Sequence, residues 1–384
     1  MPPVEESRGS AVRLRGLERV VAGFAAAVVV TCTPCAPAQE QPRGFAVERL
    51  YRAAPGAGWL VMDDLDMRGG LGGALSLAGG YAHAPLRVAD GGHRLTLVRD
   101  QAFVDFGLAV TFDRFRGYAN MTSPVVNKGE SGTVPSLTAP AVDLGSNPDT
   151  VSEVRVGVDA RLFGGPKSAL RVGAGAQLIV SSATRADYLT DGTPRGMVRL
   201  LWAGSMGMLT YAGQVGAHIR PLDEGAVPES PKGSELLFGV AAGPRLLLGA
   251  RRRTALVIGP ELFGETAFRA FLNRGATGVE ALVSARAEGT DDDGPQLRVQ
   301  VGAGAGLNAH FGAPEWRMII GVEVFDRSSD SDGDGIFDSN DACPREPGLK
   351  TRDPKTNGCP AERDTESRPE PHAALPVPFH SRCA

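Results

Sequence analysis

The sequence predicts an all-β fold, a closed antiparallel transmembrane β-barrel of about twelve strands, on three observations. Apolar and polar residues alternate with a period of two over residues 68–325. The strands that this alternation implies are about ten residues or longer, which suits a tilted crossing of a bilayer. The connections between them are alternately short and long, as is usual in bacterial outer-membrane barrels.

Residues 1–38 have the composition of a secretory signal peptide. Several arginines precede an apolar run from Val20 to Val30, and Ala36-Pro37-Ala38 supplies small residues for cleavage. The apolar run is too short to cross a bilayer as a helix. We therefore expect export and removal of residues 1–38, followed by an N-terminal periplasmic segment over residues 39–67.

The segment 153–162 illustrates the alternation of the barrel, residues 68–325. One face of this segment is apolar and the other is largely charged: Val154, Val156, Val158, Ala160 and Leu162 oppose Glu153, Arg155, Gly157, Asp159 and Arg161. The segments 297–308 and 316–324 repeat the scheme, with Ile319 as an exception. Such alternation also fits a sandwich with one wet face. The strand lengths and the connections favour a barrel, whose apolar face would contact outer-membrane lipid.

The connections predict how the barrel is oriented. Short ones are expected near residues 113–114, 164–167, 205–207, 249–253 and 288–294, and longer ones near 89–93, 127–150, 181–194, 221–233, 268–275 and 308–313. Short turns lie on the periplasmic side of such barrels and long loops lie outside. An even strand number then places both ends of the barrel in the periplasm, in an outer-membrane location.

The predicted lumen face carries charges of both signs. They are Arg155, Arg161, Arg199, Arg220, Arg286, Arg298 and Arg317 against Asp105, Glu153, Asp159, Glu261, Glu280 and Glu323. A barrel of this size has a narrow lumen, and charges at such short range pair with one another. We therefore expect a salt-bridged filling, with a structural or weakly conducting role.

After the barrel, an acidic stretch has the spacing of a calcium loop. Its expected ligands are the carboxylates of Asp330, Asp332, Asp334, Asp338 and Asp341 and the backbone carbonyl of Ile336, with a glycine for the sharp turn before Ile336. A shorter aspartate replaces the usual glutamate at the last position, and no helical pattern flanks the loop. The alternative is a solvated acidic linker. Spacing favours Ca²⁺ as the cofactor.

Two cysteines follow the acidic stretch, Cys343 and Cys359, and an odd one, Cys383, lies near the end. Export makes a disulfide between Cys343 and Cys359 the expected use of this pair, and closing that loop would stabilise the fold by about 3 kcal/mol. Zinc is the competing use, but no further cysteine or histidine lies at ligand spacing.

Several pieces of the chain resemble OmpA-family proteins of myxobacteria. They are G-F-A-V-E-R-L (44–50), W-L-V-M-D-D-L-D-M-R-G (59–69), G-P-E-L (259–262) and the acidic segment through N-G-C-P (326–360). In that family, thrombospondin type 3-like calcium repeats join an exported barrel to a C-terminal peptidoglycan-binding domain. The resemblance implies that residues 326–360 are one such calcium-binding repeat, here in the periplasm.

The end of the chain departs from that family. Residues 361–384 are proline-rich and without periodicity, so we expect a disordered tail. Nothing after the single repeat corresponds to the peptidoglycan-binding domain, which makes peptidoglycan a doubtful partner.

Other functions find little support in the sequence. The charge is near balance, with 40 basic and 44 acidic residues, and predicts no nucleic-acid partner. The histidines are scattered outside any nucleophile motif, so we do not expect an enzyme. Two alternatives to a structural barrel stay open: a solute-selective porin or transporter, and a soluble secreted calcium-binding adhesion module.

Overall fold

The computed structural model describes the barrel and most of the acidic segment. It covers residues 44–67, 71–135, 137–139, 142, 153–166, 168–181, 188–222, 233–249, 253–290, 295–308, 312–326, 330, 332, 334, 336–338 and 340–360. The predicted signal peptide (1–38) and tail (361–384) lie outside the described residues. Within this coverage, no helix combines the length and apolar character needed to cross a membrane.

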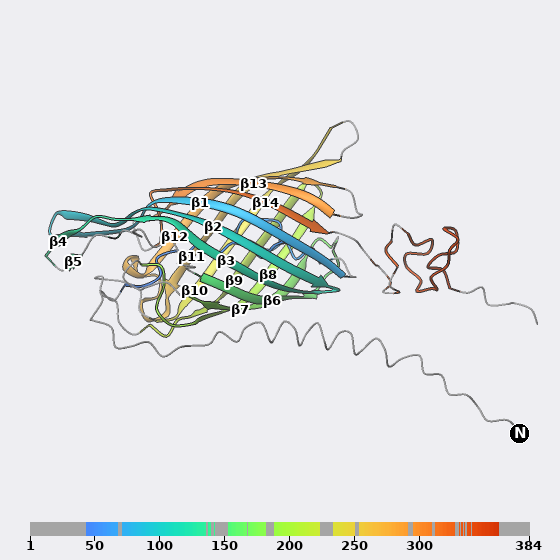
Figure 1. The fold of residues 1–384 in the computed structure, drawn as a ribbon, viewed down its shortest axis with the longest axis horizontal. Helices are drawn as coiled ribbons and strands as arrows, with labels where there is room; N and C mark the ends of the chain where they lie inside the picture. Colours follow the sequence, from blue (N-terminus) through green and yellow to red (C-terminus); the bar gives the residue numbers. More distant parts are fainter. Residues whose placement is uncertain are drawn as a thin grey trace, which may run out of the picture. The chain divides into compact units, whose positions relative to one another are not determined.

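Twelve strands pair into one closed antiparallel barrel, which confirms the predicted fold class (Figure 1). They are β1 (Leu71–Asp90), β2 (His93–Phe112), β3 (Phe115–Lys128), β6 (Glu153–Phe163), β7 (Arg171–Val180), β8 (Arg195–Met206), β9 (Leu209–Ile219), β10 (Glu235–Leu248), β11 (Thr254–Ala267), β12 (Thr277–Gly289), β13 (Pro295–Gly306) and β14 (Trp316–Asp326). Each pairs with the next barrel strand along the chain, and β1 closes the ring by pairing with β14, from Ala74↔Phe325 to His83↔Trp316. Closing a sheet on itself removes its edges.

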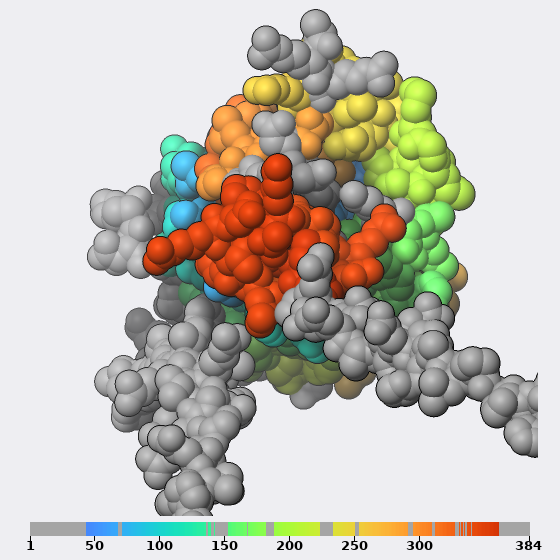
Figure 2. All heavy atoms as spheres, turned by 90° about the vertical axis from the view of Figure 1, so that its right-hand side faces the viewer, coloured from blue at the N-terminus to red at the C-terminus, as the bar shows by residue number. Residues whose placement is uncertain are grey.

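The two faces of the wall have opposite character, as the alternation predicts. On β13, Leu297 is 55% exposed and Val299 is 40% exposed, whereas the neighbouring Arg298 and Gln300 are buried at 1% and 4%. Figure 2 shows the heavy atoms from the right-hand side of Figure 1, and segments coloured green, yellow and orange follow one another around the ring. The apolar surface is therefore on the outside of the ring and the charged surface is inside.

Short and long connections lie at opposite ends of the barrel. At one end, two-residue turns join β2 to β3 and β8 to β9, and β1 begins and β14 ends there. We call this the turn end, and the opposite one, on the left in Figure 1, the loop end. The loop end carries the long connections, among them β4 (Gly132–Val134), β5 (Leu137–Ala139) and the 3₁₀ helices η2 (Phe268–Ala270) and η3 (Arg274–Ala276).

One connection at the loop end is shorter than expected. The sequence predicts a longer link over residues 89–93, but β1 and β2 continue to a two-residue turn at Gly91 and Gly92. Both glycines have positive φ, 58° and 81°. A type I′ hairpin turn, whose twist matches that of its strands, needs this conformation at both central positions, so glycine allows the hairpin to extend.

Residues 44–67 lie inside the barrel, and we call this segment the plug. At the loop end, the Val47 N–H donates to the Tyr188 carbonyl (3.0 Å) in the β7–β8 connection. At the turn end, Arg161 of β6 donates to the Met67 carbonyl, and β1 begins shortly afterwards. The plug therefore runs the length of the lumen. This corrects the prediction of a separate periplasmic segment over 39–67, because residues 44–67 are enclosed by the wall.

The acidic segment after the barrel folds back on itself through backbone hydrogen bonds and one disulfide. The Ala342 N–H donates to the Asn357 carbonyl (2.8 Å), and the Gly358 N–H donates to the Leu349 carbonyl (3.1 Å). Cys343 and Cys359 are bonded to each other, which confirms the predicted disulfide. Cys383 lies outside the described residues.

Candidate functional site: the lumen plug and the acidic loop

The charged side chains that the sequence assigns to the lumen face it. All the predicted aspartates and glutamates of this set are buried, as are all seven arginines. Burying a charge away from water is costly unless an opposite charge and hydrogen bonds compensate it. The structure supplies that compensation in two ways: some charges pair across the wall, and many pair with the plug.

At the loop end, two plug residues pair with the wall. Glu48 accepts two hydrogen bonds from Arg317 of β14, both of 2.9 Å, and Arg317 also donates to Glu280 of β12 at 2.7 Å. The next plug residue, Arg49, lies 3.0 Å from Glu265 of β11. Paired donors and acceptors of this kind fix orientation as well as charge, so the plug has a defined register against the wall here.

In the middle of the lumen, the wall binds both side chains and the backbone of the plug. Asp105 of β2 lies between Arg52 of the plug and Arg155 of β6, 3.0 Å from each. Glu261 of β11 accepts the backbone N–H groups of Leu60 (3.0 Å) and Val61 (2.9 Å). Plug backbone in a water-poor lumen needs such partners, because an unpaired buried N–H is costly.

At the turn end, the plug is held by a fully buried ion pair. Asp63 lies 2.6 Å from Arg116 of β3, and the two side chains are 2% and 1% exposed. Arg171 of β7 donates to the Asp64 carbonyl (2.9 Å). The guanidinium carbon of Arg286 lies over the ring of Trp59, 4.9 Å from the ring centroid. The face of an aromatic ring attracts a cation in this position.

Apolar packing fills the space between these pairs. Leu60, Met62 and Leu65 of the plug are buried in a cluster with wall residues whose side chains point inwards: Phe103, Leu201, Ala203, Ala212, Ala241, Val257, Phe263, Leu282 and Ile319. Ile319, the exception in the alternation of residues 316–324, belongs to this cluster. Large apolar residues on a lumen face are the signal in the sequence that indicates an internal plug.

Two cavities between described residues of the plug and the wall are small. A cavity beside Arg52, Asp105 and Arg155 has a volume of about 40 Å³. A second one, beside Tyr51 and Glu265, has a volume of about 20 Å³. A single water molecule needs roughly 10–15 Å³ measured in this way, so each cavity holds a few waters at most.

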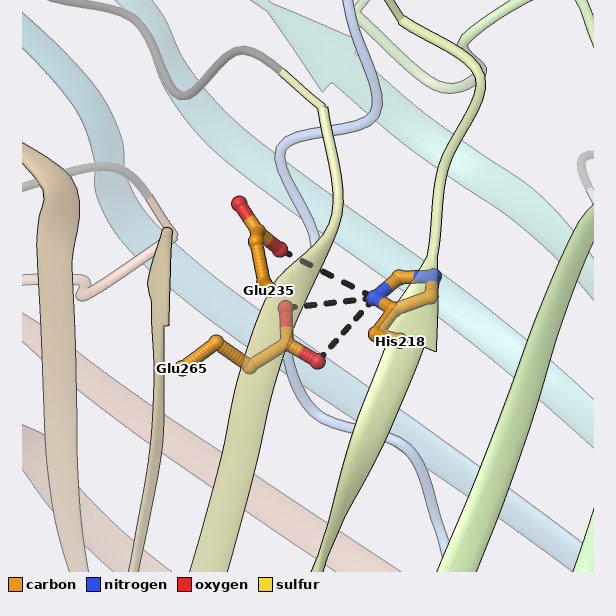
Figure 3. Close-up of side chains that lie close together, drawn as sticks. All are labelled: His218, Glu235 and Glu265. Atoms are coloured by element: carbon orange, nitrogen blue, oxygen red, sulfur yellow. Dashed lines mark hydrogen bonds and ion pairs between the residues drawn. The ribbon is translucent and has the colours of Figure 1, made fainter. Parts of the chain in front are cut away.

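His218 of β9 belongs to a buried group at the loop end (Figure 3). Its Nδ1 lies 3.1 Å and 3.3 Å from the carboxylate oxygens of Glu265 and 3.7 Å from Oε2 of Glu235, the first residue of β10. Tyr51 of the plug packs edge-on against the imidazole, with ring centroids 5.4 Å apart. Its alternation with Gln214 and Arg220 in the sequence predicts that His218 lies on the lumen face with its hydrogen bonds satisfied. The structure places it on that face, but its Nε2 has no hydrogen-bond partner among the described residues, and the residue spacing does not reveal the two glutamates.

The acidic loop after the barrel brings three of its predicted ligands together. Carboxylate oxygens of Asp330, Asp332 and Asp334 all lie within 4.8 Å of one another. Asp338 and Asp341 are not members of that group. Partial desolvation, together with the carboxylates of Asp334, Asp341 and Asp330, raises the pKa of Asp332, as expected where like charges are held close together.

Backbone hydrogen bonds shape this loop. The Ile336 N–H donates to Asp334 Oδ1 (2.8 Å), and the Cys343 N–H donates to Asp341 Oδ1 (2.7 Å). Among the described residues, Oδ2 of Asp332 and Oδ2 of Asp341 are enclosed but accept no hydrogen bond. Enclosed carboxylate oxygens without a donor fit the all-oxygen environment that calcium prefers. Residues 331, 333, 335 and 339 lie outside the described part of this loop.

Comparison with known proteins gives no family for this chain. No family model and no curated protein matches it. Among solved structures, it is similar to an outer membrane channel from Pseudomonas putida F1 (14% identity over 67% of this chain and 95% of that chain, TM-score 0.42). It is also similar to the NanC porin (7% identity over 66% of this chain and 98% of that chain, TM-score 0.39). A third similar structure is OpdK of Pseudomonas aeruginosa with vanillate (11% identity over 66% of this chain and 98% of that chain, TM-score 0.27). The predicted OmpA-family resemblance therefore stays without a matching family model.

Proposed function

We propose that the protein is an outer-membrane β-barrel, porin-like in architecture, whose channel is closed by its own plug. The outward face supports membrane insertion: Val283, Ile320 and Leu297 are 63%, 58% and 55% exposed, and lipid is the environment that such a face requires. A soluble secreted module would expose the same apolar face to water, so the observed exterior argues against that alternative.

The pairing between plug and wall carries the proposal of a structural or weakly conducting role. Arg49, Arg52 and Asp63 are buried charges whose partners are wall residues. Breaking a buried ion pair by removing one partner costs about 3–5 kcal/mol. Because the plug carries several such pairs along its length, an open lumen would be a rare state of this barrel.

Conductance in planar bilayers tests this proposal. The full chain should give small or infrequent current steps, whereas a variant lacking residues 44–67 should give larger and longer ones, because its lumen is wet and charged. Heat-dependent migration on a denaturing gel checks that both proteins are folded barrels. Large stable steps from the full chain, equal to those of the variant, would instead support the solute-selective porin.

We also propose that residues 330–341 bind Ca²⁺ and stabilise a stalk on the periplasmic side. Carboxylate oxygens of Asp330, Asp332 and Asp334 lie close together, and the enclosed Oδ2 atoms of Asp332 and Asp341 accept no hydrogen bond among the described residues. Short turns face the periplasm in bacterial barrels, and β14 ends at the turn end.

Calorimetry on the detergent-solubilised full chain tests the calcium site. We expect one calcium to bind, and the double substitution Asp332→Ala, Asp334→Ala to abolish the heat of binding because it removes two carboxylates. Asp353→Ala, in the same segment but outside the loop, is the matched control and should bind as the unchanged protein does. Equal binding by the double variant would show that the loop is only a solvated linker.

A further inference from the structure

Three neighbouring strands bring a histidine and two glutamates together at the loop end of the lumen. Glu235 is paired in register with His218 of β9 on one side and with Ala267 of β11 on the other, and Glu265 lies two residues before Ala267. All three side chains are buried, at 0–5% exposure. Figure 3 shows both carboxylates directed at one ring nitrogen of His218.

A plug arginine, Arg49, contacts both of these carboxylates. Arg49 lies 3.0 Å from Glu265 and 3.4 Å from Glu235. Arg220 also contacts Glu235 (2.9 Å), but it is shared with Asp191, which accepts two of its N–H groups. If Arg49 leaves, Glu265 loses its arginine, and Glu235 keeps only Arg220, which it shares with Asp191.

One carboxylate oxygen is left over even with Arg49 in place. Glu235 Oε2 accepts no hydrogen bond among the described residues, and it faces His218 Nδ1 at 3.7 Å. A buried acceptor without a donor is costly. It is satisfied if a cation enters the space between the three side chains.

We propose that His218, Glu235 and Glu265 form a binding site for a divalent cation of the zinc class, which Arg49 occupies while the plug is closed. In a tetrahedral zinc site with bonds of about 2.1 Å, ligand atoms lie roughly 3.4 Å apart. The separations of 3.1 Å and 3.7 Å from His218 Nδ1 to the two glutamates bracket that spacing. The imidazole selects zinc over calcium or magnesium, which prefer oxygen ligands.

Metal and plug then compete for the same carboxylates. A dication replaces the positive charge that Arg49 takes away from Glu235 and Glu265, so binding of the metal favours withdrawal of Arg49 from the wall. The coupling is reciprocal: Arg49 weakens metal binding by the same factor by which the metal weakens its contact. The consequence for conductance depends on the proposed function, but metal binding itself does not.

Zinc calorimetry on the detergent-solubilised full chain tests the site, with calcium in excess to occupy the acidic loop. Arg49→Gln should bind one Zn²⁺ at least tenfold more tightly than the unchanged protein, which corresponds to about 1.4 kcal/mol. Adding His218→Gln to that variant should remove the gain. Arg52→Gln, which loses a plug arginine paired elsewhere with Asp105, is the matched control and should bind zinc as the unchanged protein does.

Equal zinc affinity for Arg49→Gln and Arg49→Gln/His218→Gln, or for Arg49→Gln and Arg52→Gln, would overturn the proposal. Heat-dependent migration shows whether each variant is folded, and Glu265→Gln replaces His218→Gln if the latter is not. Zinc binding can fail while bilayer currents stay small, which overturns this inference alone. Large currents from the full chain without zinc would instead overturn the closed barrel.

Discussion

Single charged residues hold the plug in position, and Asp191 in the β7–β8 connection is one of them. Its Oδ1 accepts the Ala46 N–H (2.8 Å) and Arg220 (2.6 Å), and its Oδ2 accepts Arg220 (2.7 Å). Burial alone would raise the pKa of Asp191. The charge and hydrogen bonds of Arg220 and the Ala46 N–H outweigh burial and lower this pKa below the ordinary value of 3.8.

Acid should loosen this contact between plug and loop. In the interval from the ordinary pKa of 3.8 down to the lower folded pKa of Asp191, the unfolded chain binds a proton that the folded chain does not. The stabilisation by the Asp191 carboxylate is therefore complete above the unfolded pKa and is lost as pH falls through the folded pKa. Comparing the free energy of unfolding of the unchanged protein with that of Asp191→Asn, by urea titration from about pH 6 to about pH 3, measures this loss.

We expect a constant difference between the two proteins at the upper end of this range and a shrinking one at the lower end. The comparison isolates Asp191, because the other carboxylates titrate in both proteins. A difference that stays unchanged into the acid range would contradict the assigned role.

At the scale of elements, the plug depends on the wall more than on itself. A few backbone hydrogen bonds link its own residues, such as Ala53 N–H to the Leu60 carbonyl (2.9 Å). Its other contacts are ion pairs, hydrogen bonds and apolar packing against β-strands far away in the sequence. A short segment without its own ladder of hydrogen bonds gains its order from packing against neighbours.

The pair between Asp63 and Arg116 should show this dependence. Arg116→Met leaves Asp63 buried without its cation, and we expect a loss of about 3–5 kcal/mol in the free energy of unfolding. Asp63→Asn/Arg116→Met should lose less than the sum of the two single changes, because the pair couples them. Urea titration in detergent gives all three values, and strict additivity would show that the two groups do not interact.

At the scale of the whole molecule, the barrel has the polarity of a membrane protein, with an apolar outside and a charged inside. Val299 on β13 points outwards, and its neighbour Arg298 points inwards to Glu288 (2.8 Å). The alternation of apolar and polar residues in the sequence predicts this polarity, because neighbouring residues of a strand point to opposite faces of the wall.

A charge placed on the outer face should therefore be costly. Val299→Arg puts a guanidinium against lipid, and we expect a loss of about 2–4 kcal/mol if the position lies near the bilayer midplane. Reversible folding into lipid vesicles, followed by heat-dependent migration, measures the effect. Leu349→Arg, an exposed position outside the barrel, is the control and should change little. Equal stability of both variants would argue against a lipid-facing wall.

The strands of the wall were predictable from the sequence, but the contacts that fill the lumen were predictable only in part. The alternation places Val158 outside and Asp159 inside without knowledge of any partner. It also predicts that the inner charges pair, as Arg199 does with Asp159 (2.9 Å). It does not predict that Arg317 pairs with Glu48, because almost all of the barrel strands lie between these two residues in the sequence.

The sequence by itself determines most of the wall of this protein: about twelve strands, their outward faces and all the predicted connections except the tight turn at residues 91–92 follow from local spacing. Export predicts the disulfide between Cys343 and Cys359. Only the tertiary structure decides that residues 44–67 turn inwards and close the lumen. The physical reason is that strand faces follow from a repeat of two residues, whereas the plug has no repeat. Its place depends on buried charges and apolar side chains that meet only after the ring has closed.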